Sequence, residues 1–535
     1  MSVQPPEVFT PGRPGRTPPL WLIAAVVAVT LLCATAAAAW GSRGGPEAAA
    51  LPGRRLAHAS LGAHGSPSPA ASLTVSRAPG SATITVERNG SGNPLPAGAL
   101  GLSFEADQLA LSPGFDPNRG NIKNLLRTLG TGNIKIGANA VDSYVLWNPS
   151  GGQVPSWAKT PIGYAEIDRL AALSAATGWP VELAVNLAHL DAAGVADEAR
   201  YAASKLGPRL LAMECGNEPN GYPGRVRGAD WGYQQYLADF DACANAISGA
   251  GVRVAGPNTY NNTWITEFAR DRHARVAFLT DQPYSLSQHN QPGHTITELL
   301  SPENARSDVS SMAPALSAAQ QYGLPLRHDE TNSVNLGGLA GVSDVYGSAL
   351  WAVDYTLMLV RQGLSGLNFH GTIGVCDRPE QDNNVRVYTP LCAATEDDRR
   401  AGNLSPRPLY YGMLMVALMG TGTFIPATVN TRHNLTAYAV RGSDGKTRVM
   451  LVNKEATTAA PATVALSTGH PAGTKASVIR LAGASLDSRK NITVAGATVR
   501  PDGTFVQGPA ESLTTTSAGL TMTLSGGSAA LVTLS

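Results

Sequence analysis

Eight short apolar runs alternate with longer helical patterns between about residue 98 and residue 404. The runs favour β-structure, and most end in a polar side chain next to Gly, Pro or Asn. Eight strand–helix units over roughly 300 residues predict a (β/α)8 TIM barrel, an α/β fold. No GxGxxG or Walker-type loop follows a run, which disfavours an open nucleotide-binding sheet. The predicted strands cover residues 99–105, 133–140, 180–188, 209–219, 253–260, 275–284, 325–332 and 364–371.

The pattern changes after the predicted barrel, which we place at residues 98–404. One helical stretch at residues 407–420 leads into short alternating strands separated by Gly, Ser and Thr turns. This pattern of short strands and turns predicts a C-terminal all-β sandwich domain over residues 405–535. Residues 73–97 have the same texture and are expected to add strands to that sandwich. The β domain would then be built from both ends of the chain.

The N-terminal segment predicts export from the cytoplasm. Residues 20–40 carry no charge and are long enough to cross a bilayer as a helix, and Arg13 and Arg16 precede them. The small residues that end the segment also suit a signal peptidase. Residues 1–40 are therefore either a signal peptide or a membrane anchor, followed by a disordered linker at residues 41–72. Either alternative places the rest of the chain outside the cell, secreted or tethered.

Charge and composition exclude several classes of protein. The 40 Lys and Arg residues balance 39 Asp and Glu residues, so the chain lacks the basic footprint of a nucleic-acid binder. Five cysteines in 535 residues cannot form the framework of a small disulfide-rich protein. No His, Cys and Asp cluster has the spacing of metal ligands, so the sequence implies neither a metal nor another cofactor. Folding must rest on a packed core.

Candidate chemistry lies at the carboxyl ends of the predicted strands, where barrel enzymes place their active sites. Glu218, in GNEPN, ends the fourth strand, and Glu330, in RHDETNS, ends the seventh. Glycoside cleavage needs two such carboxyl groups, one to protonate the leaving oxygen and one to attack or to activate water. Asn217 is placed to bond a sugar hydroxyl. The plainer alternative for GNEPN is a turn with a surface Glu. Other polar strand ends are Glu105, Asn139, Asp142, Asn186, Asn258, Gln282, Tyr284, Asn368 and His370.

Four segments resemble glycoside hydrolase family 79, which contains heparanase and microbial β-glucuronidases and belongs to a retaining barrel clan. The resemblance spans roughly residues 73–535. It implies that Glu218 is the acid/base and Glu330 the nucleophile, and that Glu105, Asn139 and Asp142 contact sugar hydroxyls. The four segments are LGLSFE, MECGNEPN, HDETNSVNLGGLAGVSDVYGSALWAVDY and GLNFHG.

The same resemblance predicts the substrate. A uronic acid carboxylate would be held by the amide of Gly337 together with Tyr388 or Tyr284. The expected partner is a β-glucuronide or another uronic-acid-containing glycan, cleaved by double displacement. The second strand reads KIGANA and the sixth TDQPYS, which depart from the family pattern and leave the substrate open. A retaining glycosidase of another specificity and a non-catalytic carbohydrate-binding barrel remain alternatives.

Strand alternation gives further expectations for side-chain direction. His328 should share the face of Glu330, whereas Arg327 should point away from it toward the helices. His370 closes the last strand beside the site, as a substrate contact or as a structural residue.

The cysteines differ in their surroundings. Cys376 and Cys392 bracket a polar loop after the eighth strand, and an oxidising compartment predicts a disulfide between them that would hold Tyr388 over the site. Cys215 lies in a buried strand and is expected to be a free, small hydrophobic residue.

Overall fold

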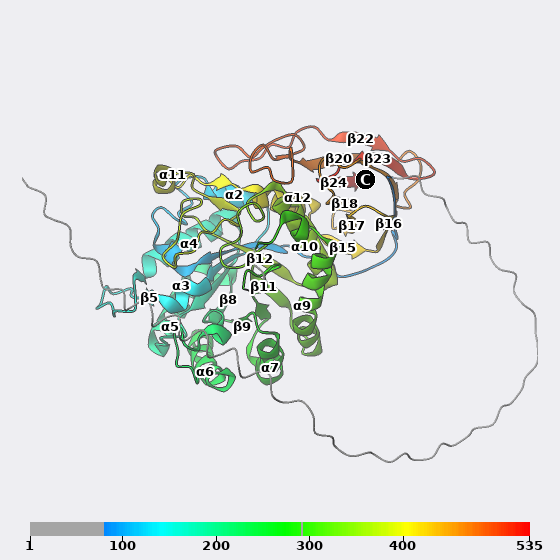
Figure 1. The fold of residues 1–535 in the computed structure, drawn as a ribbon. Coiled ribbons are helices and arrows are strands. Elements are labelled where there is room, and N and C mark those ends of the chain that lie inside the picture. The colour runs from blue at the N-terminus through cyan, green and yellow to red at the C-terminus, as the bar shows by residue number, and fades with distance from the viewer. Residues whose placement is uncertain (1–79, 290–292) are drawn as a thin grey trace, which may run out of the picture. The chain divides into compact units, whose positions relative to one another are not determined.

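A closed barrel of eight parallel strands forms the centre of the computed structural model, which describes residues 80–289 and 293–535 (Figure 1). Pairing of the last barrel strand with the first closes it, in the order β10-β11-β12-β3-β4-β7-β8-β9. The predicted (β/α)8 fold and all eight strand positions are confirmed. The strands are β3 (Leu100–Glu105), β4 (Ile134–Gly137), β7 (Val181–Val185), β8 (Leu210–Cys215), β9 (Val254–Thr259), β10 (Leu279–Asp281), β11 (Leu326–Thr331) and β12 (Gly366–Gly371).

Helices alternate with the barrel strands, and most of them bury apolar side chains. Short 3-10 helices lie between them, at η2 (Ala106–Ala110), η3 (Gly207–Arg209), η4 (Pro219–Gly221) and η5 (His273–Arg275). The α-helices are α2 (Ile122–Thr128), α3 (Ala138–Ser143), α4 (Tyr164–Thr177), α5 (Ala192–Leu206), α6 (Tyr233–Gly249), α7 (Asn262–Arg272), α8 (Ile296–Leu299), α9 (Pro302–Gln321), α10 (Tyr346–Gln362), α11 (Glu396–Ala401) and α12 (Pro408–Met419).

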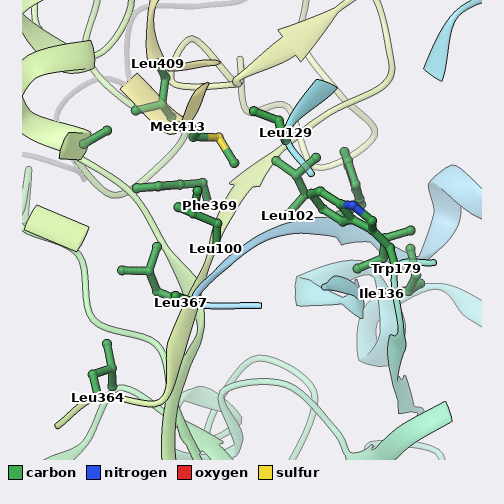
Figure 2. Close-up of a cluster of buried hydrophobic side chains, with 14 of the residues drawn as sticks. Leu100, Leu102, Leu129, Ile136, Trp179, Leu364, Leu367, Phe369, Leu409 and Met413 are labelled. Carbon is green, nitrogen blue, oxygen red and sulfur yellow. The ribbon is translucent and has the colours of Figure 1, made fainter. Parts of the chain in front are cut away.

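Helix α12, which lies beyond the predicted end of the barrel at residue 404, packs against barrel elements. Its Leu409 and Met413 join the core that contains Leu100 of β3 and Phe369 of β12 (Figure 2). The helix packs against α10, and Gly412 permits this approach because a Cβ there would lie 2.3 Å from the carbonyl oxygen of Ala349. The apolar sequence of α12 is therefore explained by burial in the barrel core.

The C-terminal part of the chain forms two β-sheets around a core of their own. β1, at the start of the described chain, pairs with β16 and in parallel with β19, while β2 pairs with β15. Both ends of the described chain therefore contribute strands to these sheets. The four-stranded sheet contains β16 (Ala427–Thr431), β1 (Ser81–Val86), β19 (Ala462–Ser467) and β23 (Leu520–Leu524). The larger sheet contains β2 (Pro94–Leu95), β15 (Gly422–Ile425), β17 (Leu435–Gly442), β18 (Thr447–Asn453), β24 (Ser528–Leu534), β20 (Lys475–Ala482), β21 (Thr493–Val494) and β22 (Glu511–Thr514).

Two short strand pairs lie in the loops around the barrel. They are β5 (Val145–Trp147) with β6 (Thr160–Ile162), and β13 (Leu391–Cys392) with β14 (Ser405–Pro406).

Charged side chains fill the barrel interior and tie its strands together. Lys135 of β4 is fully buried, and its Nζ lies 2.7 Å from Asp329 of β11 and 3.5 Å from Glu214 of β8. Burial alone would lower the pKa of Lys135, but the carboxylates around it raise it above the usual range, so the ammonium stays charged. A second pair joins Arg327 Nε to Glu182, 3.3 Å apart.

The prediction that Arg327 points toward the helices is wrong. Arg327 lies inside the barrel, where its Nη2 donates to Asn368 at 2.8 Å. The pairing of β11 with β12 shifts register between His328 and Thr331, and such a bulge interrupts strict alternation. Asp329 and Glu330 are adjacent in the sequence, but both side chains can therefore point into the barrel.

Two disulfides join elements that surround the barrel. Cys376 and Cys392 are bonded, with their Cα atoms 5.2 Å apart. Cys215 is bonded to Cys243 of α6, with a Cα separation of 6.1 Å, which corrects the expectation of a free thiol. Because Glu214 points into the barrel, the next residue of β8 points outward to the covering helix.

The N-terminal predictions lie outside the described residues. This applies to the signal or anchor at residues 20–40 and to the linker at residues 41–72. Within residues 80–289 and 293–535, no helix has the length and apolarity needed to span a membrane.

Replacing Lys135 by Met should destabilise the fold, because it leaves the carboxylate of Asp329, 2.7 Å from the Lys135 ammonium, buried without its counterion. We expect a loss of about 3–5 kcal/mol in the free energy of unfolding, measured by denaturant titration. The matched control is Lys205→Met, whose side chain is 41% exposed beside Asp168. That variant should lose no more than about 1 kcal/mol. Equal losses for the two variants would contradict the role given to Lys135.

Candidate active site

A cavity of about 820 Å³ lies at the carboxyl ends of the barrel strands. This volume falls in the upper part of the roughly 300–1,000 Å³ range of ligand pockets. Eight predicted site residues line it: Glu105, Asn139, Glu218, Tyr284, Glu330, Gly337, His370 and Tyr388. The barrel thus brings together side chains that lie up to 283 positions apart, from Glu105 to Tyr388.

Glu218 follows β8 in a left-handed backbone conformation with φ of 47°. Its amide donates to the carbonyl oxygen of Asn258 at 2.8 Å, which fixes the turn to β9. Burial raises the pKa of Glu218, and the negative charge of Glu330 raises it further, to about 8. Glu218 is therefore a carboxylic acid that can hold its proton at neutral pH.

Glu330 near the end of β11 is buried and accepts a hydrogen bond from the hydroxyl of Tyr284 at 2.8 Å. The Nδ1 of His370 lies 3.8 Å from its other oxygen, Oε2. That oxygen has no hydrogen-bond partner among the described residues. Glu330 is thus oriented through one oxygen and keeps the other available.

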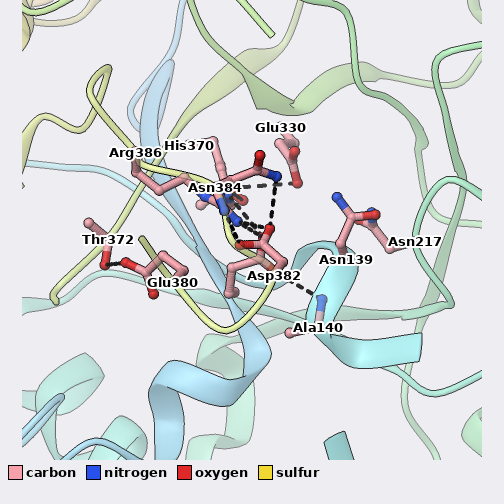
Figure 3. A network of polar contacts seen from close by, with 12 residues as sticks. Asn139, Ala140, Asn217, Glu330, His370, Thr372, Glu380, Asp382, Asn384 and Arg386 are labelled. Carbon is pink, nitrogen blue, oxygen red and sulfur yellow. Dashed lines mark hydrogen bonds and ion pairs between the residues drawn. The ribbon is translucent and has the colours of Figure 1, made fainter. Parts of the chain in front are cut away.

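Glu105 at the end of β3 contacts Arg386, His370 and Ala140, which are labelled in Figure 3. Arg386 Nη2 donates to Glu105 Oε1 at 2.6 Å, the amide of Ala140 donates to Oε2 at 2.8 Å, and His370 Nε2 lies 3.6 Å from Oε1. Burial alone would raise the pKa of Glu105, but His370, Arg386 and the Ala140 amide together lower it to about 2. This carboxyl group is ionised and acts as a hydrogen-bond acceptor.

Asp142 does not line the cavity, contrary to its predicted contact with sugar. It lies in α3, which starts immediately after β4, and its carboxylate accepts from the amides of Leu187, Ala188 and Asn217 and from Tyr222. Its bond to the Asn217 amide is 2.7 Å long. Asp142 therefore positions the residue before Glu218.

Asn217 is buried beside the cavity rather than among the residues that line it. Its Oδ1 accepts from Gln282 Nε2 at 2.7 Å, whereas its Nδ2 has no partner among the described residues. The orientation of the Asn217 side-chain amide is thus fixed by Gln282, which directly follows β10, and its two N–H groups are left to donate.

Gly337 joins the loop after β11 to the loop closed by the Cys376–Cys392 disulfide. Its carbonyl accepts from the amides of Val387 and Tyr388, and a Cβ on Gly337 would lie 2.3 Å from the carbonyl oxygen of Val385. Its φ of +87° also favours glycine. The amide of Gly337 donates to no acceptor within the described part of the chain. Tyr388, which follows in the disulfide loop, has its hydroxyl 3.5 Å from that of Tyr284.

Sequence reasoning missed the polar residues of the disulfide loop. Asp382, Asn384 and Arg386 line the cavity, and Arg386 bonds both Glu105 and Asp382 at 2.6 Å. Its Nε and Nη1 have no partner in the described ranges. Only the two bracketing cysteines indicated that this loop returns to the site. Arg225, which also lines the cavity, was missed for the same reason, because it lies in a loop.

His328 does not line the cavity, although its partner does. It is fully buried, and its Nδ1 lies 2.5 Å from Asp281, which is one of the lining residues. His328 thus supports Asp281 from behind. Within residues 80–289 and 293–535, no cluster of three or more His, Cys, Asp and Glu side chains is arranged to hold a metal ion.

Comparison with known proteins gives matches over both parts of the chain. Residues 437–531 match the model of the glycosyl hydrolase family 79 C-terminal β domain. A β-glucuronidase of Aspergillus niger is 26% identical over 283 residues, which cover 46% of this chain and 48% of that protein. The chain therefore spans about half the length of this curated relative.

Solved structures show the same fold. A 4-O-α-L-rhamnosyl-β-D-glucuronidase from Fusarium oxysporum 12S superposes with a TM-score of 0.69 at 23% identity, covering 84% of this chain and all of that one. A family 51 arabinofuranosidase from Xanthomonas axonopodis pv. citri gives a TM-score of 0.60 at 14% identity, covering 85% and 100%.

The barrel and the appended β domain thus share the fold of the two superposed glycosidases, with a carboxyl-lined cavity at the carboxyl ends of the barrel strands. The C-terminal β domain therefore resembles that of glycoside hydrolase family 79 over residues 437–531.

Glu105 should make the stability of the protein depend on acid pH. Because its pKa is lowered from 4.5 to about 2 on folding, its contribution is present above about pH 4.5 and is lost as the pH falls toward 2. Between pH 5 and pH 2, the free energy of unfolding of the wild type should fall by up to about 3 kcal/mol more than that of Glu105→Gln. Denaturant titrations at stepped pH measure this difference.

The matched control is Glu87→Gln, at an exposed position in the β domain. It should keep the acid dependence of the wild type. If Glu105→Gln keeps it as well, the ionised state assigned to Glu105 is wrong.

Proposed function

We propose that the protein is a retaining glycoside hydrolase that cleaves β-linked glucuronic acid by double displacement. One observation carries the proposal: a single cavity holds two carboxyl groups whose environments differ. Burial and the negative charge of Glu330 raise the pKa of Glu218 to about 8, whereas Glu330 accepts a hydrogen bond from the hydroxyl of Tyr284. Retaining glycosidases need this division between a proton donor and an ionised nucleophile.

In the first step, Glu330 attacks the anomeric carbon while Glu218 gives its proton to the glycosidic oxygen, and the bond to the leaving group breaks. In the second step, Glu218, now ionised, takes a proton from water, whose oxygen displaces Glu330 from the same carbon. The product keeps its anomeric configuration. Asn217, with its Nδ2 free to donate, is the proposed contact for the hydroxyl next to the reacting carbon.

The substrate carboxylate is proposed to lie against the loop that follows β11. The unpaired amide of Gly337 and the hydroxyl of Tyr388 supply donors there without a cationic side chain, whereas the hydroxyl of Tyr284 already donates to Glu330. Glu105, Asn139 and His370 are proposed to contact sugar hydroxyls on the opposite side. Arg386 offsets the charge of Glu105 and Asp382, which reduces the repulsion of an anionic sugar.

We propose that the enzyme acts outside the cytoplasm. The two disulfides, Cys215–Cys243 and Cys376–Cys392, support this location, because such bonds persist in oxidising compartments. Residues 20–40 would serve as the export signal or as an anchor.

Removal of each carboxyl group should have a different effect on turnover. Glu330→Ala should abolish it, because no nucleophile remains. Glu218→Ala should spare substrates with good leaving groups, and azide should partly rescue it to give a glycosyl azide of retained configuration. The measurements are turnover of aryl β-glucuronides with leaving groups of graded acidity and product analysis by NMR. Rescue of Glu330→Ala, with none for Glu218→Ala, would reverse the roles.

A uronic acid site should discriminate among sugars. We expect kcat/KM for an aryl β-glucuronide to exceed that for the matching β-glucoside and β-xyloside by at least about tenfold, or about 1.4 kcal/mol. Equal rates would refute the carboxylate site but leave the retaining mechanism intact. Absence of turnover on all three, with binding retained, would favour the non-catalytic alternative.

A further inference from the structure

A second cavity, of about 50 Å³, lies between helix α5 and the segment that carries strands β5 and β6 (Figure 1). It shares no lining residue with the catalytic cavity, although helix α3 contributes to both. Asn139 and Ser143 of that helix line the catalytic cavity, whereas Val141 lines the second one. The second cavity reaches the surface at His189, which is exposed. Its size suits a ligand of a few heavy atoms, since a cavity of about 150 Å³ holds benzene.

Glu198 interrupts the apolar face of α5 at this cavity. The buried residues of that face follow the spacing of an amphipathic helix, at Val195, Ala199, Ala202 and Leu206. Glu198 lies among them, is only 7% exposed and lines the cavity. No described residue bonds its carboxyl group or pairs with it. A buried carboxyl group without a partner costs free energy, whereas alanine or leucine would suit this helix face without that cost.

The rest of the lining is mainly apolar and aromatic, and its two indole rings are held by contacts of their own. Trp147 Nε1 donates to Asp197 at 3.0 Å. The Trp157 ring stacks on the ring of His189, with 3.9 Å between the ring centroids. Neither tryptophan therefore needs Glu198 for its position. An apolar and aromatic wall around one buried polar group is the usual composition of a small-molecule site.

The charges around the second cavity favour a cation. Burial raises the pKa of Glu198 to about 8, and the negative charge of Asp197 contributes to this rise. Burial and the charge of Arg227 lower the pKa of His189, so this side chain is neutral at pH 7. Asp191 lines the cavity as well, and no lysine or arginine lines it in the described part of the chain. The faces of the indole rings also attract cations.

We propose that the second cavity binds a small aliphatic ammonium ion, with its ammonium group against Glu198 and its alkyl group between Trp147 and Trp157. The carboxyl group loses its proton to the solvent and forms an ion pair with the ligand, which keeps all its own protons. A neutral ligand or a water molecule can also bond the carboxyl group, but it gains nothing from charge. The inference is independent of the proposed function, because it uses no residue that lines the catalytic cavity.

The test measures binding of isobutylammonium to the full chain at pH 8.5. At that pH Glu198 is largely ionised, and an alkylammonium, like lysine, keeps its proton. The indole N–H signals of protein labelled with ¹⁵N-tryptophan report on the cavity, because Trp147 and Trp157 line it. The variants Trp147→Phe and Trp157→Phe assign the two signals. We expect both signals to shift saturably, with a Kd of about 1–10 mM.

Two ligands of similar shape separate charge from size. Isobutanol has as many heavy atoms as isobutylammonium but carries no charge, and isobutyrate carries the opposite charge. Isobutanol should bind at least about tenfold more weakly than isobutylammonium, because only the ammonium forms charge-assisted hydrogen bonds with the carboxylate. Isobutyrate should cause no saturable shift, because its carboxylate would meet the charge of Glu198.

Glu198→Gln keeps the shape of the side chain and removes its charge. It should lower the affinity for isobutylammonium at least about tenfold and leave that for isobutanol within about threefold. Its melting temperature should not fall below that of the wild type, because no described residue loses a hydrogen bond. The matched control is Glu303→Gln on α9, where the side chain is 73% exposed. That variant should bind isobutylammonium as the wild type does.

Each contrary outcome has a distinct meaning. If isobutylammonium and isobutanol bind the wild type equally well, the cavity is an apolar pocket and the cation site is refuted. If no ligand shifts the two indole signals at concentrations up to about 50 mM, the cavity holds water alone and the proposal fails. Equal affinity of the wild type and Glu198→Gln for isobutylammonium would also overturn it. None of these measurements requires turnover, so a failure of the proposed function would leave them unchanged.

Discussion

The buried ammonium of Lys135 is the interaction on which the rest of the barrel depends. It lies between the carboxylates of Asp329 and Glu214 and so joins β4, β11 and β8, three strands that close the interior from different sides. Asp329 immediately precedes Glu330, and Glu214 lies four residues before Glu218. The ion cluster therefore fixes the two strands that carry the candidate catalytic carboxyl groups. An apolar interior would pack as well, but it would not hold the bulge in β11 that turns two adjacent acidic residues inward.

A second layer of contacts positions the rim of the cavity. Asp142 holds the backbone before Glu218, and Arg386 joins the disulfide loop to Glu105. The carbonyl oxygen of Gly337 accepts hydrogen bonds from the amides of Val387 and Tyr388, which lie in the same disulfide loop. The cavity rim is thus held by residues that follow the second, seventh and eighth barrel strands. The Cys376–Cys392 disulfide limits how far these loops can separate.

Structural features that depend only on neighbouring residues could be predicted from the sequence. The strands follow from short apolar runs, and Glu218 and Glu330 follow because strand ends in a barrel converge on one face. The role of Arg386 could not be predicted, because it depends on the folding of a loop that brings Arg386 to Glu105, 281 positions earlier in the chain. Asp142 and Arg327 were misread for related reasons: a helix begins directly after β4, and a bulge breaks the alternation of β11. To predict the Cys215–Cys243 disulfide, one would have to know which residue of α6 faces Cys215 of β8. Periodicity alone does not give this.

The pairing of β1 with β19 has a consequence for the order in which the chain folds. β1 is among the first described segments to be made, yet its parallel partner lies about 380 residues later, with Ser81 opposite Thr463. During synthesis, the barrel segments are complete before that partner exists, so β1 must wait with an unpaired edge while the barrel forms. Completion of the four-stranded sheet is therefore a late event, because its strands β19 and β23 are made long after β1.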